Sequence, residues 1–252
     1  MAYPSIVFCH GAWHNVEFFR KVIAILEPLG YRCVTVSLPS ASGRVPPTTS
    51  LDEDIAAIRN AVVKELDAGN DVMMNAHSWG GIPTSTALEG LTKPERLESG
   101  KTTGVMKLTF VSSFIIPENT SLLDTIGGKP GDEWVIDVDG NLTIDADYRQ
   151  VFYHDVDPNE VEEWLAKLKP QSVASFTTKT TSAAWKKIPA AYLICEDDRI
   201  IPVPFQEALI EKVKEEGGEI VTTRLFVSHS PYITKPDAVA NFLKTAIEEA
   251  LN

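Results

Sequence analysis

Ser78 lies in a short stretch whose residue types suit a nucleophile. The stretch reads HSWGG over residues 77–81, follows an apolar run at 71–76 and leads into a helical pattern. A serine in a sharp strand-to-helix turn needs small residues two positions to either side, because the strained backbone and the incoming helix leave no room for larger side chains. Ala76 and Gly80 meet this need, although the common form of the turn has glycine at the first place. The alternative interpretation is a serine that only caps a helix.

A serine hydroxyl is a weak nucleophile at neutral pH, so it needs a histidine base that a carboxylate orients. In one chain order of such a triad the serine comes first, then the acid and then the histidine, each after a strand. Among the five histidines, His229 follows a late apolar run at 220–226. The others precede the serine, adjoin it or lie outside the strand pattern (His10, His14, His77 and His154). His229 is therefore the predicted base.

The acid is expected directly after the apolar run at 190–195. Asp198 stands three residues past the end of that run and is followed by two isoleucines and Pro202, a loop that returns a carboxylate toward the sheet. Asp198 is the predicted acid. Asp197 and Glu196 remain alternatives.

Acyl transfer also needs backbone N–H groups that point at the developing oxyanion. One donor would be Trp79, directly after the serine. Its partner would come from residues 10–14 (HGAWH), after the first apolar run, where Gly11 allows a tight turn that leaves the Ala12 amide free. Trp13 is a second candidate for this donor.

The elements that must position these residues are short. Apolar runs at 5–9, 31–36, 71–76, 105–112, 190–195 and 220–226 predict buried strands, and helical patterns at 51–67, 204–216 and 236–251 separate or follow them. This alternation is typical of a parallel α/β sheet covered by helices on both faces. We expect the chemical residues at the rim of that sheet.

The stretch 117–187 breaks the pattern, so we predict a core domain at 1–116 and 188–252 with an inserted cap or lid at 117–187. A hairpin is expected at 134–144 around Asp139-Gly140-Asn141. Short helices should follow at 147–153 and 158–168, the second with Asp157 as N-cap. Seven aromatic residues could line an apolar pocket there: Trp134, Tyr148, Phe152, Tyr153, Trp164, Phe176 and Trp185.

Composition narrows the classes of partner. The 252 residues contain 23 Lys and Arg against 35 Asp and Glu, a formal charge of −12, and this argues against nucleic acid and membrane surfaces as partners. No membrane-length apolar run or signal peptide is evident, so a cytoplasmic protein is expected. Cys9, Cys33 and Cys195 lack metal-ligand spacing and predict buried thiols in a reducing compartment. No metal or cofactor is expected.

The stretch from Phe8 to Trp13, the Ser78 turn, the loop through Asp198 to Pro202 and His229 together resemble the α/β-hydrolase superfamily. Within it, the chain resembles the small methylesterases, the hydroxynitrile lyases and their microbial esterase relatives. The resemblance implies a mostly parallel central sheet flanked by helices, with a cap over the C-terminal edge of the strands. It implies Ser78 as nucleophile, His229 as base and then acid, Asp198 as its orienter, and Ala12 and Trp79 as oxyanion donors.

The expected function is hydrolysis of a small to medium, largely apolar carboxylic ester or lactone through an acyl-enzyme, without a cofactor. Hydroxynitrile lyases of the group carry threonine after the oxyanion-loop histidine and lysine after the triad histidine, where this chain has Gly11 and Ser230, and this favours hydrolysis. Two alternatives stay open. One is a carbon–carbon lyase, by hydroxynitrile, retro-aldol or decarboxylating chemistry in the same pocket, and the other is a non-catalytic small-molecule receptor. A homodimer is also left open.

Overall fold

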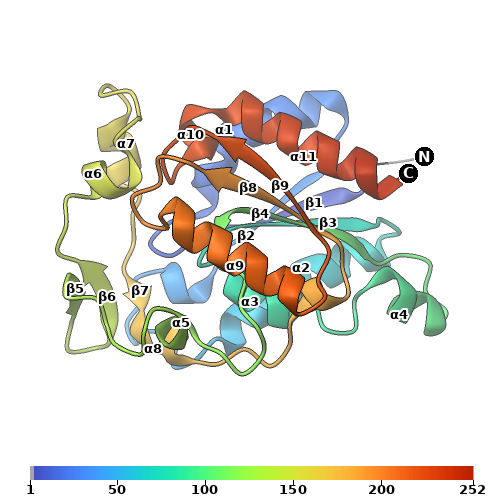
Figure 1. Cartoon of the computed structure of the whole chain (residues 1–252), viewed down its shortest axis with the longest axis horizontal. Helices are drawn as coiled ribbons and strands as arrows, with labels where there is room; N and C mark the ends of the chain where they lie inside the picture. Colours follow the sequence, from blue (N-terminus) through green and yellow to red (C-terminus); the bar gives the residue numbers. More distant parts are fainter. Residues whose placement is uncertain (1–2, 252) are drawn as a thin grey trace.

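The centre of the computed structural model, which describes residues 3–251, is a six-stranded sheet (Figure 1). All of its neighbouring strands run parallel. In sheet order the strands are β2 (Cys33–Val36), β1 (Ser5–Cys9), β3 (Val72–Ser78), β4 (Val105–Ser113), β8 (Ala190–Cys195) and β9 (Ile220–Leu225). The predicted mostly parallel sheet flanked by helices is confirmed. Residues 1, 2 and 252 of the predicted core lie outside the described part.

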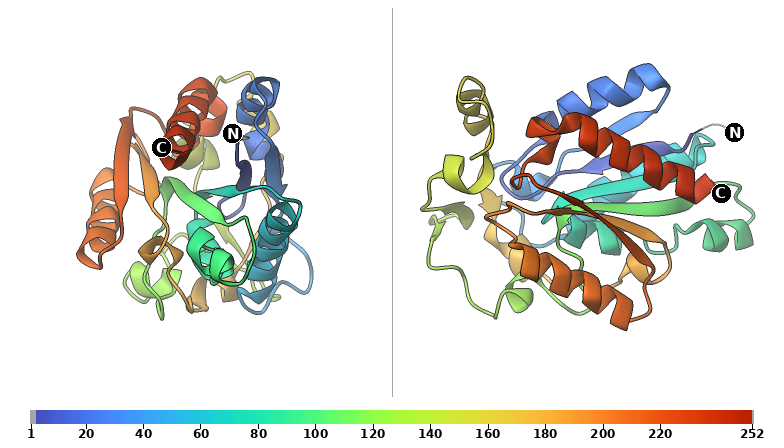
Figure 2. Two further views of the ribbon diagram at one scale, coloured as in Figure 1. Left: turned by 90° about the vertical axis from the view of Figure 1, so that its right-hand side faces the viewer. Right: turned by 45° about the horizontal axis from the view of Figure 1, so that its top comes forward.

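Helices cover both faces of the sheet (Figures 1 and 2). One face carries α1 (Arg20–Leu26) and α11 (Pro236–Leu251), and the other carries α2 (Asp52–Asp67), α3 (Gly81–Ala87) and α9 (Val203–Glu215). All five residues of β1 are buried, because alternate side chains enter opposite layers. Val7 belongs to the apolar cluster that includes residues of α2, and Phe8 to the cluster that includes residues of α1 and α11.

The strand order reverses between β1 and β3. The chain leaves β1 for β2 on one side and then returns to place β3 on the other side of β1. The loops after β1 and β3 therefore diverge, and a crevice forms at their carboxyl ends, where open α/β sheets bind ligands. This crevice receives the loop at Gly11 and the turn at Ser78.

Two expectations about the core need correction. The run at 220–226 was expected to be a buried strand, but β9 is an edge strand in which Val221 is 51% exposed, and Phe226, directly after β9, is 73% exposed. An edge strand has a neighbour on one side only, so its run of β-branched residues serves pairing more than burial. All three cysteines are free thiols; Cys9 and Cys195 are buried, as expected, whereas Cys33 is only half-buried.

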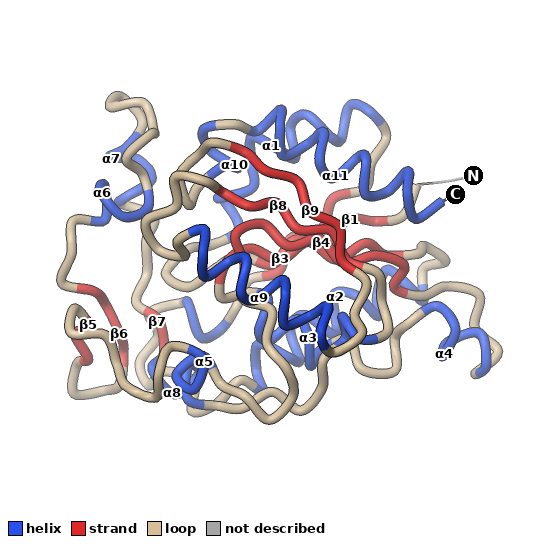
Figure 3. The backbone as a smooth tube through the Cα atoms, in the orientation of Figure 1, coloured by secondary structure: helices blue, strands red, loops and turns tan. Residues whose placement is uncertain are grey.

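Residues 117–187, called the inserted segment below, lie between β4 and β8 and form short elements joined by long loops (Figure 3). They include a second, three-stranded sheet, which is antiparallel and has the strand order β5-β6-β7. The elements are α5 (Leu122–Thr125), β5 (Trp134–Ile136), β6 (Asn141–Ile144), α6 (Tyr148–Phe152), α7 (Val161–Leu165), β7 (Gln171–Ser172), α8 (Val173–Thr177) and η4 (Ala184–Lys186). The hairpin is present as predicted, with Asn141 in the strand instead of the turn.

The expected cap of the second short helix is wrong. Helix α7 begins at Val161, later than predicted, and Glu160 holds its N-cap position. The Asp157 carboxylate instead accepts the N–H of Asn159, in a turn ahead of the helix.

The remaining elements are short helices near the ends of strands and helices. They are η1 (Val16–Phe19), η2 (Glu27–Leu29), η3 (Pro39–Ala41), α4 (Lys93–Glu98) and α10 (Pro231–Thr234). Within residues 3–251 no helix is both long and apolar enough to span a membrane.

Candidate active site

Ser78 is the last residue of β3, and its backbone is held in the left-handed region with φ of 54°. Such a φ is strained for a residue with a Cβ, and strain of this kind gathers at functional turns. Gly80 must be small chiefly because the end of β1 and the loop after it pass close to the turn, and not because of the incoming helix that the sequence suggested. A Cβ on Gly80 would lie 2.5 Å from the carbonyl oxygen of His10.

The structure places three predicted side chains in one hydrogen-bonded row. The Nε2 atom of His229 lies 2.9 Å from Oγ of Ser78, and its Nδ1 atom lies 2.6 Å from Oδ2 of Asp198. His229 is 1%, Ser78 6% and Asp198 7% exposed, so water screens these contacts little. Because a carboxylate can only accept, Nδ1 of His229 donates to Asp198 and leaves Nε2 free to accept the serine proton.

Asp198 is fixed by its own loop. Its Oδ1 atom accepts the N–H groups of Ile200 at 2.7 Å and Ile201 at 2.9 Å, and its Oδ2 atom also accepts the hydroxyl of Ser112. The other candidate acids face elsewhere. Asp197 contacts His154 at 2.9 Å, and Glu196 pairs with Arg224 at 2.7 Å.

Two histidines near the site, His10 and His14, are held neutral. His10 donates through Nδ1 to the carbonyl of Gly11, at 2.9 Å, and accepts the N–H of Leu38 at Nε2. His14 donates to the carbonyl of Ala12 at 2.8 Å. Burial lowers the pKa of His10 to about 4 and the pKa of His14 to about 3. At neutral pH neither side chain adds positive charge beside His229.

His77 points away from the serine, as expected. Its Nε2 atom lies 2.9 Å from the backbone carbonyl oxygen of His229. His154 lies in the inserted segment and contacts the Asp197 carboxylate through Nε2. Of the five histidines, His229 is the one that contacts Ser78 Oγ.

The loop after β1 approaches the serine closely. A Cβ on Gly11 would lie 2.7 Å from Cβ of Ser78, so glycine is needed here for space. The positive φ of this loop is at Trp13, at 61°. Within residues 3–251 we find no hydrogen-bond acceptor for the N–H of Ala12 or Trp79. Both amides are therefore available to a ligand.

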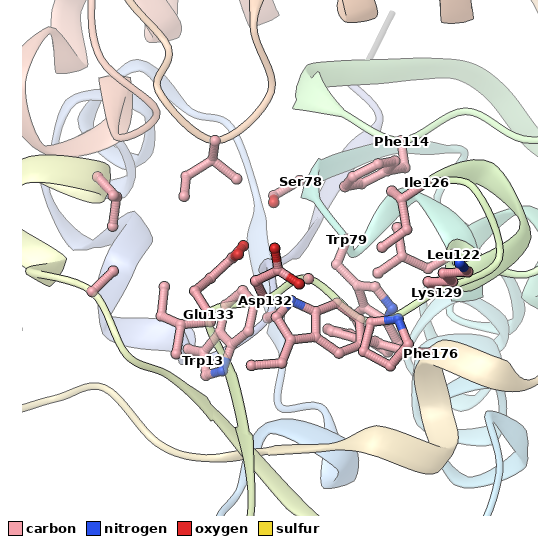
Figure 4. A pocket seen from close by; sticks show the side chains of 18 of the residues that line it. Trp13, Ser78, Trp79, Phe114, Leu122, Ile126, Lys129, Asp132, Glu133 and Phe176 are labelled. Carbon is pink, nitrogen blue, oxygen red and sulfur yellow. The ribbon is translucent and has the colours of Figure 1, made fainter.

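A cavity of about 750 Å³ opens in front of Ser78 (Figure 4). Its aromatic wall comes from Trp13, Trp79, Phe114, Trp134 and Phe176. Of the seven aromatic residues expected to line a pocket, Trp134 and Phe176 do so. The other five lie in apolar clusters and do not line the cavity: Tyr148, Phe152, Tyr153, Trp164 and Trp185.

The outer part of the cavity is charged. Lys129, Asp132, Glu133 and Arg199 are among its lining residues, and all four are exposed. Figure 4 shows the carboxylates of Asp132 and Glu133 reaching into the cavity below Ser78 in that view. The cavity thus combines an aromatic, apolar wall with charged side chains in its outer part.

Comparison with known proteins relates this geometry to a family. A model of the alpha/beta hydrolase family matches residues 6–242. The chain belongs to this family. It is 32% identical to alpha/beta hydrolase nvfD of Aspergillus novofumigatus, over 100% of this chain and 99% of the relative. It is 28% identical to methylesterase 9 of Arabidopsis thaliana, over 93% of each. A crystal structure of a polyneuridine aldehyde esterase mutant aligns with a TM-score of 0.77 at 17% identity, over 96% of this chain and 99% of that one.

The predicted resemblance to the methylesterase-like group of α/β hydrolases is thereby confirmed, and hydrolase chemistry is supported at the level of the family. Within residues 3–251 of this alpha/beta hydrolase, no group of three or more His, Cys, Asp and Glu side chains is arranged to hold a metal ion.

Sequence reasoning missed two residues of the alpha/beta hydrolase site. Ser112 ends a predicted run and, with φ of 38°, turns its hydroxyl to Asp198. The run at 105–112 and its place at the same sheet edge could have indicated it. Trp13 was considered only as an amide donor. Its indole also lines the cavity and donates to the carbonyl of Leu142 in β6, at 3.0 Å, so it joins the loop after β1 to the inserted segment.

Proposed function

We propose that this alpha/beta hydrolase cleaves a carboxylic ester or lactone through a covalent acyl-enzyme on Ser78. The observation that carries the proposal is the buried row from Ser78 through His229 to Asp198, which opens into a largely apolar cavity. A serine, a histidine and a carboxylate in this order are the parts of a nucleophile, its base and the orienter of that base.

In the first half-reaction, Nε2 of His229 takes the Ser78 proton as Oγ attacks the substrate carbonyl carbon. The amides of Ala12 and Trp79 donate to the oxyanion that forms, and Asp198 stabilises the imidazolium. The carbon–oxygen bond to the alcohol then breaks, and the alcohol leaves with the proton from His229. In the second half, water gives a proton to His229, attacks the acyl carbon and releases the acid, while Ser78 recovers its proton.

The proposed substrate is of medium size and largely apolar. Pockets of about 300 to 1,000 Å³ enclose small organic ligands, and this cavity of about 750 Å³ falls in that range. Trp134 and Phe176 pack on each other, with ring centroids 5.4 Å apart, and together give the cavity an aromatic surface that suits an aromatic or alicyclic group. We further propose that the inserted segment acts as the cap that selects the substrate, because it supplies much of the cavity wall.

An aryl ester tests this proposal. We expect purified protein mixed with p-nitrophenyl butyrate to release p-nitrophenol, and rapid quenching followed by mass spectrometry to find a butyryl adduct on the peptide that contains Ser78. Ser78→Ala should abolish both signals. Turnover of cyanohydrins or β-keto acids without any Ser78 adduct would support the lyase alternative instead. Ligand-dependent thermal stabilisation without turnover of any substrate would support the receptor.

A further inference from the structure

His77 links the strand of the nucleophile to the loop of the base. It precedes Ser78 on β3, and its Nε2 atom lies 2.9 Å from the main-chain carbonyl oxygen of His229. Since a carbonyl oxygen only accepts, Nε2 carries the proton and donates. Two hydrogen bonds therefore join neighbouring residues of β3 to His229, one from Ser78 to its imidazole and one from His77 to its backbone.

The surroundings of His77 keep it in one state. The side chain is fully buried, and its Nδ1 atom has no hydrogen-bond partner within residues 3–251. A Cβ on Gly11 would lie 3.1 Å from that atom, so the loop after β1 passes close to this side of the ring. Burial, together with the nearby His229 and His14, lowers the pKa of His77 well below its usual range. The ring is thus a neutral donor with a fixed tautomer.

Aromatic neighbours hold the ring in place. Its centroid lies 4.8 Å from that of Phe18, 5.5 Å from that of Tyr232 and 4.7 Å from that of His229. Packing of this density leaves the imidazole little freedom to turn. The hydrogen bond to His229 therefore has a rigid donor.

The base needs such a support because of where its loop lies. His229 follows β9, the exposed edge strand of the sheet, whereas Ser78 ends the central strand β3. Other bonds to this loop come from the periphery: the N–H of Asp197 donates to the carbonyl of Val227, and Asp155 accepts the N–H of Ser228. Among these contacts, only the hydrogen bond from His77 connects the main chain of His229 to β3, the strand that carries Ser78.

We propose that His77 is a positioning residue, which sets the distance between Nε2 of His229 and Oγ of Ser78 by holding the main-chain carbonyl of His229. This inference rests on the proposed hydrolase function. A misplacement of about 1 Å in a reacting group can cost about 100-fold in rate, so one main-chain bond at this point can control turnover.

A pair of substitutions tests the donor itself. His77→Gln can keep an N–H near the position of Nε2, whereas His77→Met has a similar length and no donor. With p-nitrophenyl butyrate we expect His77→Met to lower kcat by about 10- to 100-fold while KM changes less than about twofold. His77→Gln should recover most of the lost kcat. Tyr232→Phe is the matched control, because it removes the buried bond from Tyr232 to Asn75 in the same aromatic cluster without touching His229. It should lower Tm and leave kcat within about twofold.

Three results would overturn the proposal: an unchanged kcat in folded His77→Met, no recovery in His77→Gln, or an equal loss in Tyr232→Phe. A second readout does not need turnover. The NMR signals of the His229 imidazole should shift or broaden in His77→Met and return toward the parent values in His77→Gln. If the parent protein hydrolyses no ester, the proposed function fails, whereas unchanged His229 signals in His77→Met would remove the positioning role alone.

Discussion

The rim of the central sheet and the inserted segment face the same cavity but are built differently. At the rim, Asp198 and His229 are almost fully buried, and the carboxylate of Asp198 accepts from two backbone amides, a serine and a histidine. In the inserted segment, the loop at 127–133 is mostly exposed, although it lines the outer cavity. Buried polar groups with satisfied partners have one geometry, whereas an exposed loop can adopt several.

The difference separates two tasks. The proposed proton transfer needs groups that are held to within about 0.5 Å, and the ends of parallel strands in a sheet can hold side chains in this way. Substrate choice needs shape, and a wall of loops and short helices can change shape without disturbing the sheet. We therefore expect changes at the rim to act on kcat and changes in the inserted segment to act on KM and substrate preference.

The sharpest test of the sheet rim is removal of Ser78, the proposed nucleophile, or of His229, the proposed base. Ser78→Ala and His229→Ala should each reduce kcat for p-nitrophenyl butyrate by about 1,000-fold or more, because the members of such a unit act together. The double variant should be little worse than either single one. Circular dichroism and Tm should stay close to those of the parent. Additive losses in the double variant would contradict a shared proton-transfer row.

Removal of the carboxylate should lower kcat at Asp198 but not at the neighbouring Asp197. Asp198→Asn should keep the fold and lower kcat by up to about 10,000-fold, because an amide donor at this place holds the imidazole in the wrong tautomer. Asp197→Asn is the matched control, since its carboxylate contacts His154. It should keep activity within about threefold of the parent. The reverse result would mean that the base is oriented from the neighbouring residue.

A buried carboxylate in α2, which Ser40 links to the inserted segment, makes stability depend on pH. Asp54 is fully buried and accepts the N–H of Ser40, whose hydroxyl accepts from Gln171 of the inserted segment. Burial raises the pKa of Asp54 from 3.8 to about 6. Because the folded state holds this proton more tightly than the unfolded state, the contribution of Asp54 to stability falls as pH rises from about 4 to about 6, and the penalty is complete above that range.

Asp54→Asn should remove this penalty and still accept from Ser40. We expect its free energy of unfolding to exceed that of the parent by about 2 to 3 kcal/mol at pH 8, and the two proteins to converge near pH 4. Urea unfolding at both pH values measures this. A gain of equal size at pH 4 and pH 8 would show that titration of Asp54 is not its cause.

The smallest predicted effect concerns the wall of the cavity. Trp134→Ala should raise KM for a bulky naphthyl ester by about 10-fold and leave kcat for p-nitrophenyl acetate nearly unchanged, since it removes contact area without touching the reacting groups. Val138→Ala, at a fully exposed position beyond β5, is the control and should alter neither value. A large loss of kcat with the small ester in Trp134→Ala would contradict the expectation that the sheet rim acts on kcat and the inserted segment acts on KM.

The order of strands and helices in the core was predictable because local pattern and burial agree there. The run at 71–76 predicted β3, and the periodic apolar residues at 51–67 predicted α2 to within one residue. The pattern could not tell that β9 is an edge strand, because a short apolar run looks the same at the edge and in the centre of a sheet. Nor did the seven aromatic residues of the inserted segment reveal which of them face the cavity, since residue type does not specify side-chain direction.

The sequence by itself determined which residue types stand at which strand ends: a serine between small neighbours, acidic residues after β8 and a histidine after β9. These are local facts, set by turn sterics and by alternation along the chain. Only the tertiary structure decided that Asp198 and not Asp197 meets His229, that the Ser112 hydroxyl donates to Asp198, and that the His77 imidazole donates to the main-chain carbonyl of His229. Each of these contacts joins residues at least 31 positions apart, and the pairing register of neighbouring strands, which no local pattern encodes, brings them together.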